Sequence, residues 1–372
     1  MSRFFDLVSR PARDMGEIEA LPPLPPQLSS SSRIIKLDSN ENPFGPSPRA
    51  VQAMQAALLA ANSYPDDDCS ELKRKLADHH SLPAQQVMVT AGSTGLIALL
   101  CQTLLSPGLN AVTSERSFIV YSMAVHGAGA QLIEAPMHDD GIDLDAILGT
   151  INEHTRIIFL ANPNNPTGTL LKPDAVDKFM SEVPGHVVVV LDEAYYEFAA
   201  YLAEHRKTEY SRSLEYLRQG FNVVALRTFS KAHGLAGLRI GYGLGPAELL
   251  AYCARMRNTF SVSSVAQAAA IAALDDTRHV HRTVSNNAAQ ASIVGVALSE
   301  MDFRVIPTWA NFLCCDLDRD ATEVAESLRA DAVSVRPLRA WGAPSCIRVS
   351  IGVPEQNEIF LSAMKKLAKT RK

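Results

Sequence analysis

The sequence has neither a long apolar run nor a cluster of basic residues. A membrane-spanning helix needs about 20 consecutive apolar residues, and no stretch of the 372 residues approaches that length. The 35 basic residues are outnumbered by 40 acidic ones, which gives a net charge of −5 and disfavours a nucleic-acid partner. We therefore expect no association with a membrane or with nucleic acid.

Cysteine is also sparse. The six cysteines form no Cys-x-x-Cys pair, and zinc sites and disulfide frameworks depend on regular spacings. We expect reduced thiols, no bound metal and no catalytic cysteine. The apolar stretch after Met1 is too short for a secretory signal, and Asp6, Asp14 and Glu17 disfavour a transit peptide. The sequence therefore predicts a cytoplasmic protein.

The chain does have the length and the apolar content for more than one core. Hydrophobic residues make up 47% of it, and chains beyond about 250–300 residues usually divide into domains. We expect an N-terminal arm over residues 1–34, a large domain over 35–270 and a small domain over 271–372. The arm contains the proline-rich segment Leu21–Pro26, which favours an extended conformation.

Helical and strand patterns alternate between residues 47 and 265, which is typical of a parallel sheet with helices on both faces. Seven short apolar runs predict its strands: 86–90, 110–114, 130–135, 156–161, 187–191, 222–227 and 238–243. Residues 265–302 predict two helices, and 303–372 predict further strands and a final helix. The expected fold class is α/β, a mostly parallel seven-stranded sheet sandwiched by helices, with a smaller α+β domain.

One lysine lies among groups suited to binding an anion. In Thr228-Phe-Ser-Lys231 two hydroxyls precede Lys231, and Arg239 follows eight residues later. The pKa of a lysine falls readily when it is desolvated or near other cations, which frees the amine to attack a carbonyl. Such a cluster can hold a phosphorylated aldehyde covalently, although a Ser-Lys pair alone more often marks a solvated loop.

Two further strand ends carry groups that such a cofactor needs. Asp192 follows the run 187–191, and a carboxylate there can pair with a pyridinium nitrogen and keep it protonated. Tyr195, and Asn165 after the run 156–161, can donate hydrogen bonds to the ring oxygen. Ligands bind outside the carboxyl ends of parallel strands. Because Lys231 also follows an apolar run, we expect a pyridoxal phosphate site at this edge of the sheet.

The segment Ala91-Gly-Ser-Thr-Gly95 joins the strand predicted at 86–90 to a helix. Glycine allows the backbone to approach a ligand closely, and a helix N-terminus presents free N–H groups to an anion. We expect six residues to surround the cofactor phosphate: Gly92, Ser93, Thr94, Thr228, Ser230 and Arg239.

In this order the motifs resemble fold-type I aminotransferases of classes I and II, and within that group the chain is similar to histidinol-phosphate aminotransferases. The resemblance covers roughly residues 35 to 365 and also rests on Leu37–Pro48, Tyr64–Asp66 and Cys346–Gly352. It implies pyridoxal 5′-phosphate as the cofactor, the fold of that enzyme group, and a homodimer with shared active sites.

The resemblance also implies roles for single residues. Phe118 matches an aromatic residue that stacks on the cofactor ring, and Tyr64 matches a tyrosine that reaches the cofactor phosphate of the neighbouring subunit. Four residues match positions near the substrate: Arg348, Arg336, Asn311 and Asn42. Many family members carry Tyr-Val-Pro-Gly in the arm, where this chain has Ala20–Pro26, so a substrate contact from the arm is left open.

The implied reaction is transamination. Lys231 would hold the cofactor and then move a proton at the substrate α-carbon, Asp192 would keep the ring nitrogen protonated, and Tyr195 would assist at the ring oxygen. The resemblance favours histidinol phosphate and 2-oxoglutarate, giving imidazole acetol phosphate and glutamate in histidine biosynthesis. Three alternatives stay open: an aromatic amino-acid aminotransferase, a threonine-phosphate decarboxylase, and a regulatory domain that binds the cofactor without catalysis.

Overall fold

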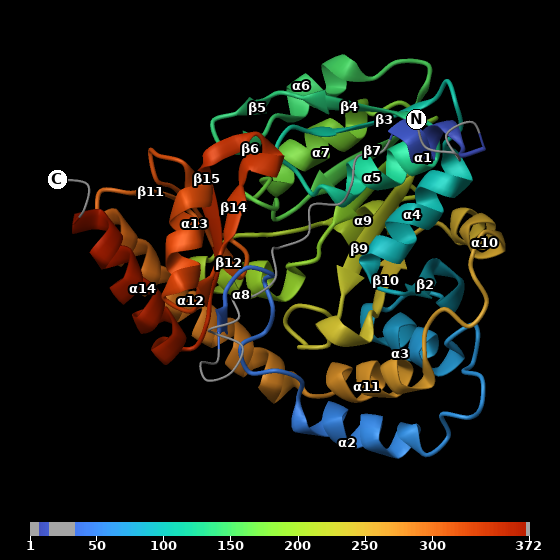
Figure 1. Ribbon diagram of the computed structural model, residues 1–372. Helices are drawn as coiled ribbons and strands as arrows, with labels where there is room; N and C mark the ends of the chain where they lie inside the picture. The colour runs from blue at the N-terminus through green and yellow to red at the C-terminus, as the bar shows by residue number, and fades with distance from the viewer. Residues whose placement is uncertain (1–6, 15–33, 370–372) are drawn as a thin grey trace.

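The computed structural model describes residues 7–14 and 34–369. At its centre is a seven-stranded sheet (Figure 1). Its strands, in spatial order, are β2 (Val87–Thr90), β10 (Gly241–Leu244), β9 (Val223–Thr228), β8 (Val188–Asp192), β7 (Thr155–Ala161), β3 (Asn110–Ser114) and β4 (Gln131–Ala135). Neighbours pair in parallel, except that β10 runs antiparallel to β2 and β9. The predicted mostly parallel sheet is confirmed.

Helices cover both faces of this sheet. One face packs on α4 (Ser93–Leu104), α5 (Val120–Gly127) and α10 (Ala247–Arg255). The other face packs on α3 (Ser70–His80), α6 (Leu144–Thr150), α7 (Pro173–Glu182), α9 (Ser213–Arg218) and α11 (Ser264–Leu274). Alternate residues of one strand enter the two cores, Val112 on one side and Ala111 on the other. This two-sided burial explains why the strands are continuous apolar runs.

The strand predicted at 238–243 was wrong at its start. Ala236–Leu238 form a 3₁₀ turn, and Arg239 has φ of 51°. The strand β10 begins only at Gly241, where a Cβ atom would lie 2.5 Å from the backbone nitrogen of Ser93. Glycine is required there because the first turn of α4 rests directly on the strand.

A second, four-stranded antiparallel sheet belongs to the smaller α+β domain, at the left of Figure 1. Its order is β11 (Arg304–Ile306), β12 (Phe312–Asp316), β15 (Ala343–Ser350) and β14 (Arg336–Leu338). The helices α13 (Ala321–Ala330) and α14 (Pro354–Lys369) contribute to its core. The long helix α12 (Thr277–Ser299) contacts α8 (Tyr196–Arg206) of the large domain as well as β11 and α14 of the small domain, so it connects the two domains.

The segment that begins at Ile35 joins this smaller sheet region, whereas α1 (Arg10–Asp14) contacts α5 on the large sheet. The short strand β1 (Ile35–Lys36) pairs in parallel with β13 (Val333–Ser334), and Leu37 is buried in the same core. The chain then crosses to α2 (Pro48–Leu58), which packs beside α11 although the two are far apart in sequence (Figure 1). The domain limits given above stay a prediction, and Leu21–Pro26 lie outside the described residues.

The remaining elements are small. They are α1 (Arg10–Asp14), β5 (Met137–His138), β6 (Gly141–Ile142), and 3₁₀ turns at Ala84–Gln86 and Arg339–Trp341. Within residues 7–14 and 34–369, no helix is both long and apolar enough to cross a bilayer. All six cysteines are buried and unpaired.

Candidate active site

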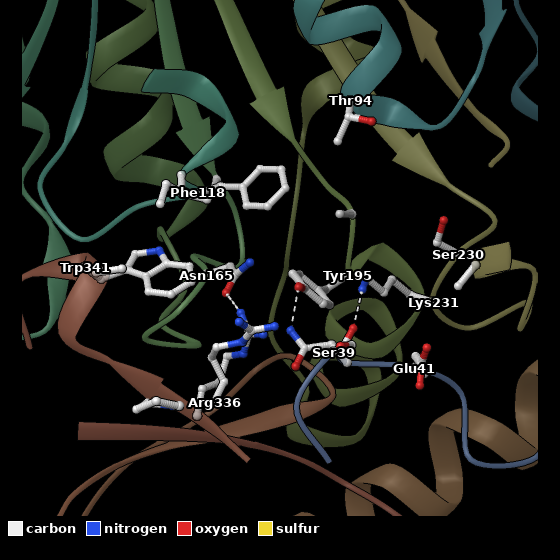
Figure 2. A pocket seen from close by; sticks show the side chains of 18 of the residues that line it. Ser39, Glu41, Thr94, Phe118, Asn165, Tyr195, Ser230, Lys231, Arg336 and Trp341 are labelled. Atoms are coloured by element: carbon white, nitrogen blue, oxygen red, sulfur yellow. Dashed lines mark hydrogen bonds between the residues drawn. The ribbon is translucent and has the colours of Figure 1, made fainter. Parts of the chain in front are cut away.

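A cavity of about 1230 Å³ opens between the carboxyl ends of the central strands and the small domain. Figure 2 shows Lys231, Ser230 and Thr94 on one side of it, with Arg336 and Trp341 across from them. The cavity brings together most of the predicted site residues: Ser93, Thr94, Phe118, Asn165, Asp192, Tyr195, Thr228, Ser230, Lys231, Arg239, Arg336 and Arg348.

The amine of Lys231 projects into the cavity just after the end of β9. It is half-buried, and its Nζ donates to the main-chain carbonyl of Ser39 at 3.1 Å (Figure 2). Burial, followed by the positive charge of Arg348, lowers the pKa of Lys231 to about 7. A large share of this amine is therefore unprotonated near neutral pH, as a nucleophile or base requires.

The carboxylate of Asp192 lies at the end of β8 and is only 4% exposed. Its Oδ2 accepts the hydroxyl of Tyr121 at 2.8 Å, and its Oδ1 accepts the N–H of Ala194 at 3.2 Å. Burial raises the pKa of Asp192 to about 6. A cationic ring nitrogen placed beside it would offset that burial, because an opposite charge favours the ionised carboxylate.

Two hydrogen-bond donors meet near this carboxylate. Asn165 uses its Oδ1 to accept Arg348 Nη1 at 2.6 Å, and the Tyr195 oxygen accepts Asn40 Nδ2 at 2.9 Å. In the part of the chain that the structure describes, the Asn165 amide N–H₂ and the Tyr195 O–H have no other partner. Both donors can therefore serve one acceptor atom in the cavity, such as a ring oxygen.

Hydroxyls and one guanidinium form a cup at the N-terminus of α4. Arg239 Nη2 lies 3.4 Å from Thr94 Oγ1, and Arg239 Nη1 lies 3.5 Å from Ser230 Oγ. Thr228 Oγ1 donates to Ser230 at 3.0 Å. A Cβ atom on Gly92, where φ is 76°, would lie 2.6 Å from Arg239 Nη2. These donors and the free N–H groups of a helix start suit a phosphate.

The opposite wall carries two arginines. Arg336 on β14 and Arg348 on β15 are cross-strand partners. Arg348 is only 6% exposed, and its Nη2 donates to the carbonyl of Asp38 at 2.9 Å. Among the described residues the Nε atoms of both arginines are buried without a partner. Burial, together with the charge of Arg336, lowers the pKa of Arg348. An anion is the ligand that this wall lacks.

Four predicted residues do not line the cavity: Gly92, which lies behind the cup beside Arg239, and Asn311, Asn42 and Tyr64. Asn311 donates to the carbonyl of Asn40 at 3.0 Å, and Asn42 donates to the carbonyl of Ala232 at 2.8 Å. Both amides thus brace neighbouring main chain. Tyr64 is 82% exposed and stacks on Phe260 with ring centroids 4.5 Å apart, outside the cavity of its own chain. The substrate and cofactor roles given to these residues stay predictions.

Two residues at the site went unnoticed in the sequence. Tyr121 is fully buried on α5, and its hydroxyl donates to Asp192. The available signal was a tyrosine at the end of the apolar segment 118–121, since a buried tyrosine needs a partner. Asn40 lies two positions before Asn42, and nothing in the sequence separates the two amides. Phe118 does line the cavity, and its ring meets that of Tyr121 edge-on at 5.6 Å.

The fold and this arrangement of lysine, carboxylate and anion cup can be compared with known proteins. The chain belongs to the aminotransferase class I and II family, whose model matches residues 32–364. The resemblance and the class of enzyme expected from the motifs are thereby confirmed.

Individual relatives agree. The chain is 42% identical over 334 residues to histidinol-phosphate aminotransferase 2 of Pseudomonas aeruginosa, covering 90% of this chain and 89% of that protein. The histidinol-phosphate aminotransferase of Akkermansia muciniphila is 40% identical over 335 residues, 90% of each. The solved structure of histidinol-phosphate aminotransferase from Sinorhizobium meliloti in complex with pyridoxal-5′-phosphate has a TM-score of 0.87 and 27% identity, covering 100% of this chain and 99% of that one.

The fold is shared more widely. L-threonine-O-3-phosphate decarboxylase from Porphyromonas gingivalis has a TM-score of 0.78 and 22% identity, covering 90% of this chain and 100% of that one. At that identity the likeness concerns the fold alone, so the choice among reactions depends on the site and on the nearer relatives.

Proposed function

We propose that the protein is a pyridoxal-phosphate-dependent aminotransferase that transfers the amino group of histidinol phosphate to 2-oxoglutarate, giving imidazole acetol phosphate and glutamate. The observation that carries this proposal is one cavity lined by Lys231, with a pKa of about 7, by the buried carboxylate of Asp192 and by the anion cup of Thr94, Ser230 and Arg239. Two relatives named histidinol-phosphate aminotransferase, which are 40 and 42% identical to this chain, support the choice of substrate.

The residues present fit pyridoxal phosphate. The cup of Thr94, Ser230 and Arg239 would hold its phosphate, Asp192 its ring nitrogen, and Asn165 with Tyr195 its ring oxygen. When bound, the cofactor supplies an electron-withdrawing ring that stabilises negative charge at the substrate α-carbon. Asp192 supports that withdrawal by remaining ionised, which Tyr121 and the Ala194 N–H favour through their hydrogen bonds.

Lys231 has two tasks in this proposal. Its unprotonated amine would anchor the cofactor, and when free it would remove the proton from the substrate α-carbon and later return one. A pKa of about 7 suits both directions of this transfer. The Ser39 carbonyl, 3.1 Å from Nζ, offers the displaced amine a fixed position inside the cavity.

Arg336 and Arg348 would bind the anionic groups of both substrates in turn. A planar guanidinium accepts either a phosphate or a carboxylate with paired hydrogen bonds. The two arginines are cross-strand neighbours with unused Nε donors, so the wall can offer different atoms to the phosphate of the amino donor and the carboxylates of the oxo acid.

The proposed assembly is a cytoplasmic homodimer with shared active sites. Tyr64 and its stacking partner Phe260 are both exposed on this chain, as a residue reserved for the neighbouring subunit's cofactor phosphate would be.

The visible absorption spectrum tests the proposal. Purified protein loaded with pyridoxal phosphate is titrated with histidinol phosphate, phenylalanine and O-phosphothreonine, each with and without 2-oxoglutarate. We expect the visible absorption band of the bound cofactor to disappear at a low concentration of histidinol phosphate and to return when 2-oxoglutarate is added. A response to phenylalanine alone would favour an aromatic aminotransferase, and carbon dioxide released from O-phosphothreonine would favour a decarboxylase. A protein that takes up no cofactor would refute the whole assignment.

A further inference from the structure

The segment 38–40 passes between the two domains and touches the reacting lysine as well as the arginine wall. The carbonyl of Asp38 accepts Arg348 Nη2 at 2.9 Å, and the carbonyl of Ser39 accepts Lys231 Nζ at 3.1 Å. Asn40, the next residue, directs its side chain at Tyr195. Three consecutive residues thus form hydrogen bonds with three different side chains of the cavity.

We propose that Asn40 is a positioning residue for the reaction: it holds the Tyr195 hydroxyl as a donor toward the cofactor ring oxygen and fixes the Ser39 carbonyl beside Lys231. This inference rests on the proposed function, since it concerns the same cofactor. Asn40 itself touches neither the cofactor nor the substrate in this proposal and acts through its neighbours.

Every polar atom of Asn40 is occupied. Its N–H donates to Ser350 Oγ at 2.8 Å, its Oδ1 accepts from the same hydroxyl at 3.1 Å, and its carbonyl accepts Asn311 Nδ2 at 3.0 Å. The residue is 1% exposed and has φ of 54°, a left-handed conformation that asparagine and glycine tolerate best. The orientation of its amide toward Tyr195 is therefore fixed by the small domain.

The direction of the Asn40–Tyr195 bond matters. Because Nδ2 donates, the tyrosine oxygen is the acceptor, and its own hydrogen remains available for another group. Accepting one hydrogen bond makes an O–H a stronger donor in a buried site. A stronger donor stabilises the anionic form of the ring oxygen, so that oxygen loses its proton at a lower pH.

Two substitutions of Asn40 distinguish a role in positioning Tyr195 from a purely structural role in stabilising the fold. Asn40→Gly keeps the left-handed backbone without strain and removes only the amide. Asn40→Asp keeps the size but replaces the donor with a carboxylate, which would itself accept the Tyr195 hydrogen. Asn357→Ala is the matched control, because Asn357 is a buried asparagine on α14 that bonds Gly352 and lies outside the cavity.

The readout is the pH midpoint of the visible absorbance of the cofactor-bound protein, measured without substrate. Relative to the wild type, we expect the midpoint to rise by about 0.5 to 1 pH unit in Asn40→Gly, the equivalent of one neutral hydrogen bond. It should rise further in Asn40→Asp, which removes the donor and adds a negative charge, and stay unchanged in Asn357→Ala.

Unshifted midpoints in both Asn40 variants would overturn the proposal, even if their thermal stability fell as in the control. Should the Asn40 variants fail to fold, Ser350→Ala leaves the amide in place but frees it, and the same upward shift of smaller size is expected. No shift in that variant would also overturn the proposal. A wild-type protein without a visible band would instead refute the proposed function, so the two failures are distinguishable.

Discussion

The two walls of the cavity are built in different ways. On the wall formed by the large sheet, the polar groups already have protein partners that fix their direction, as Tyr121 does for Asp192. On the wall formed by the small domain, Arg336 makes no ion pair within the described residues, and its Nε, like that of Arg348, has no partner. Each group of the large-sheet wall is held by a protein partner that leaves the donors of Asn165 and Tyr195 for one acceptor, whereas among the described residues the small-domain wall has buried guanidinium atoms without a partner.

This difference indicates which kind of ligand each wall can bind. Fixed donors and a fixed carboxylate are pre-organised for a group that stays in place, and they cost no reorganisation during the reaction. Spare guanidinium donors suit anions that change between the two halves of a reaction. The contrast supports the proposal that the cofactor binds at the large-sheet wall and that the two substrates bind in turn at the small-domain wall.

The largest effect is expected when the large-sheet wall, called the fixed wall below because protein partners hold its groups, loses the amine of Lys231. Lys231→Ala should lower turnover roughly 10⁴-fold or more, because both the anchor and the proton-transfer group are removed. Turnover and the visible spectrum are the measurements, and Lys178→Ala, which removes an exposed lysine, is the control. Normal single-turnover transamination by Lys231→Ala, with the fold intact by circular dichroism, would contradict the assignment.

Loss of an arginine should weaken substrate binding more than cofactor binding. Arg348→Met should lower kcat/KM about 100-fold for both substrates, as expected for charge-assisted hydrogen bonds. Arg336→Met should be more selective and affect the phosphate-bearing amino donor most. Steady-state kinetics with each substrate measures this, and Arg304→Met removes a cation from an exposed ion pair as the control. Weakened cofactor binding without any change in substrate KM would remove the distinction between the walls.

The walls are also coupled through charge, and pH exposes the coupling. The cofactor-free protein should capture pyridoxal phosphate faster as pH rises and level off above about 7, because only unprotonated Lys231 reacts. Arg348→Met should move this curve to higher pH, and Glu41→Gln to lower pH, since Arg348 lowers and Glu41 raises the pKa of Lys231. Shifts of about 0.5 to 1 unit are expected.

Stopped-flow absorbance gives the capture rate at each pH, with Arg304→Met as the control for a lost positive charge. A curve that still rises through pH 9 in the wild type would mean that Lys231 titrates like a solvated lysine. Coincident curves for Arg348→Met and the wild type would mean that the two walls do not interact.

The smallest effect concerns the completion of the fixed wall by a second subunit. Tyr64→Phe should weaken cofactor binding about 10-fold, the value of one hydrogen bond to a charged group. Mixed with Lys231→Ala, it should form hybrid dimers in which one site has both native residues, so cofactor affinity and activity should exceed those of the separate variants. Activity that follows simple dilution would count against shared sites.

Much of the fold and of the fixed wall could be predicted from the sequence. Strand ends are predictable because apolar runs such as 187–191 are buried on both faces, and polar residues that follow such runs lie at one edge of the sheet. Asp192, Asn165 and Lys231 were placed together on that argument alone, and all three line the cavity.

What could not be predicted depends on contacts between distant parts of the chain. Asn40 and Asn42 belong to one short motif, but only Asn40 turns toward Tyr195, because its left-handed backbone is held by Ser350. Nothing local distinguishes the two amides. The late start of β10 has a similar origin, since Gly241 is defined by the helix turn resting on it rather than by its own neighbours.

The pairing of β1 with β13 has a consequence for how the molecule is made. Asn40 and its partner Ser350 are 310 positions apart in sequence, so the small domain draws on both ends of the chain. During synthesis the central sheet can form long before those ends meet. A chain stopped before β14 would contain Lys231 and the anion cup but neither Arg336 nor Arg348. Under the proposed roles, the part of the site that selects the substrate is therefore the last to be synthesised.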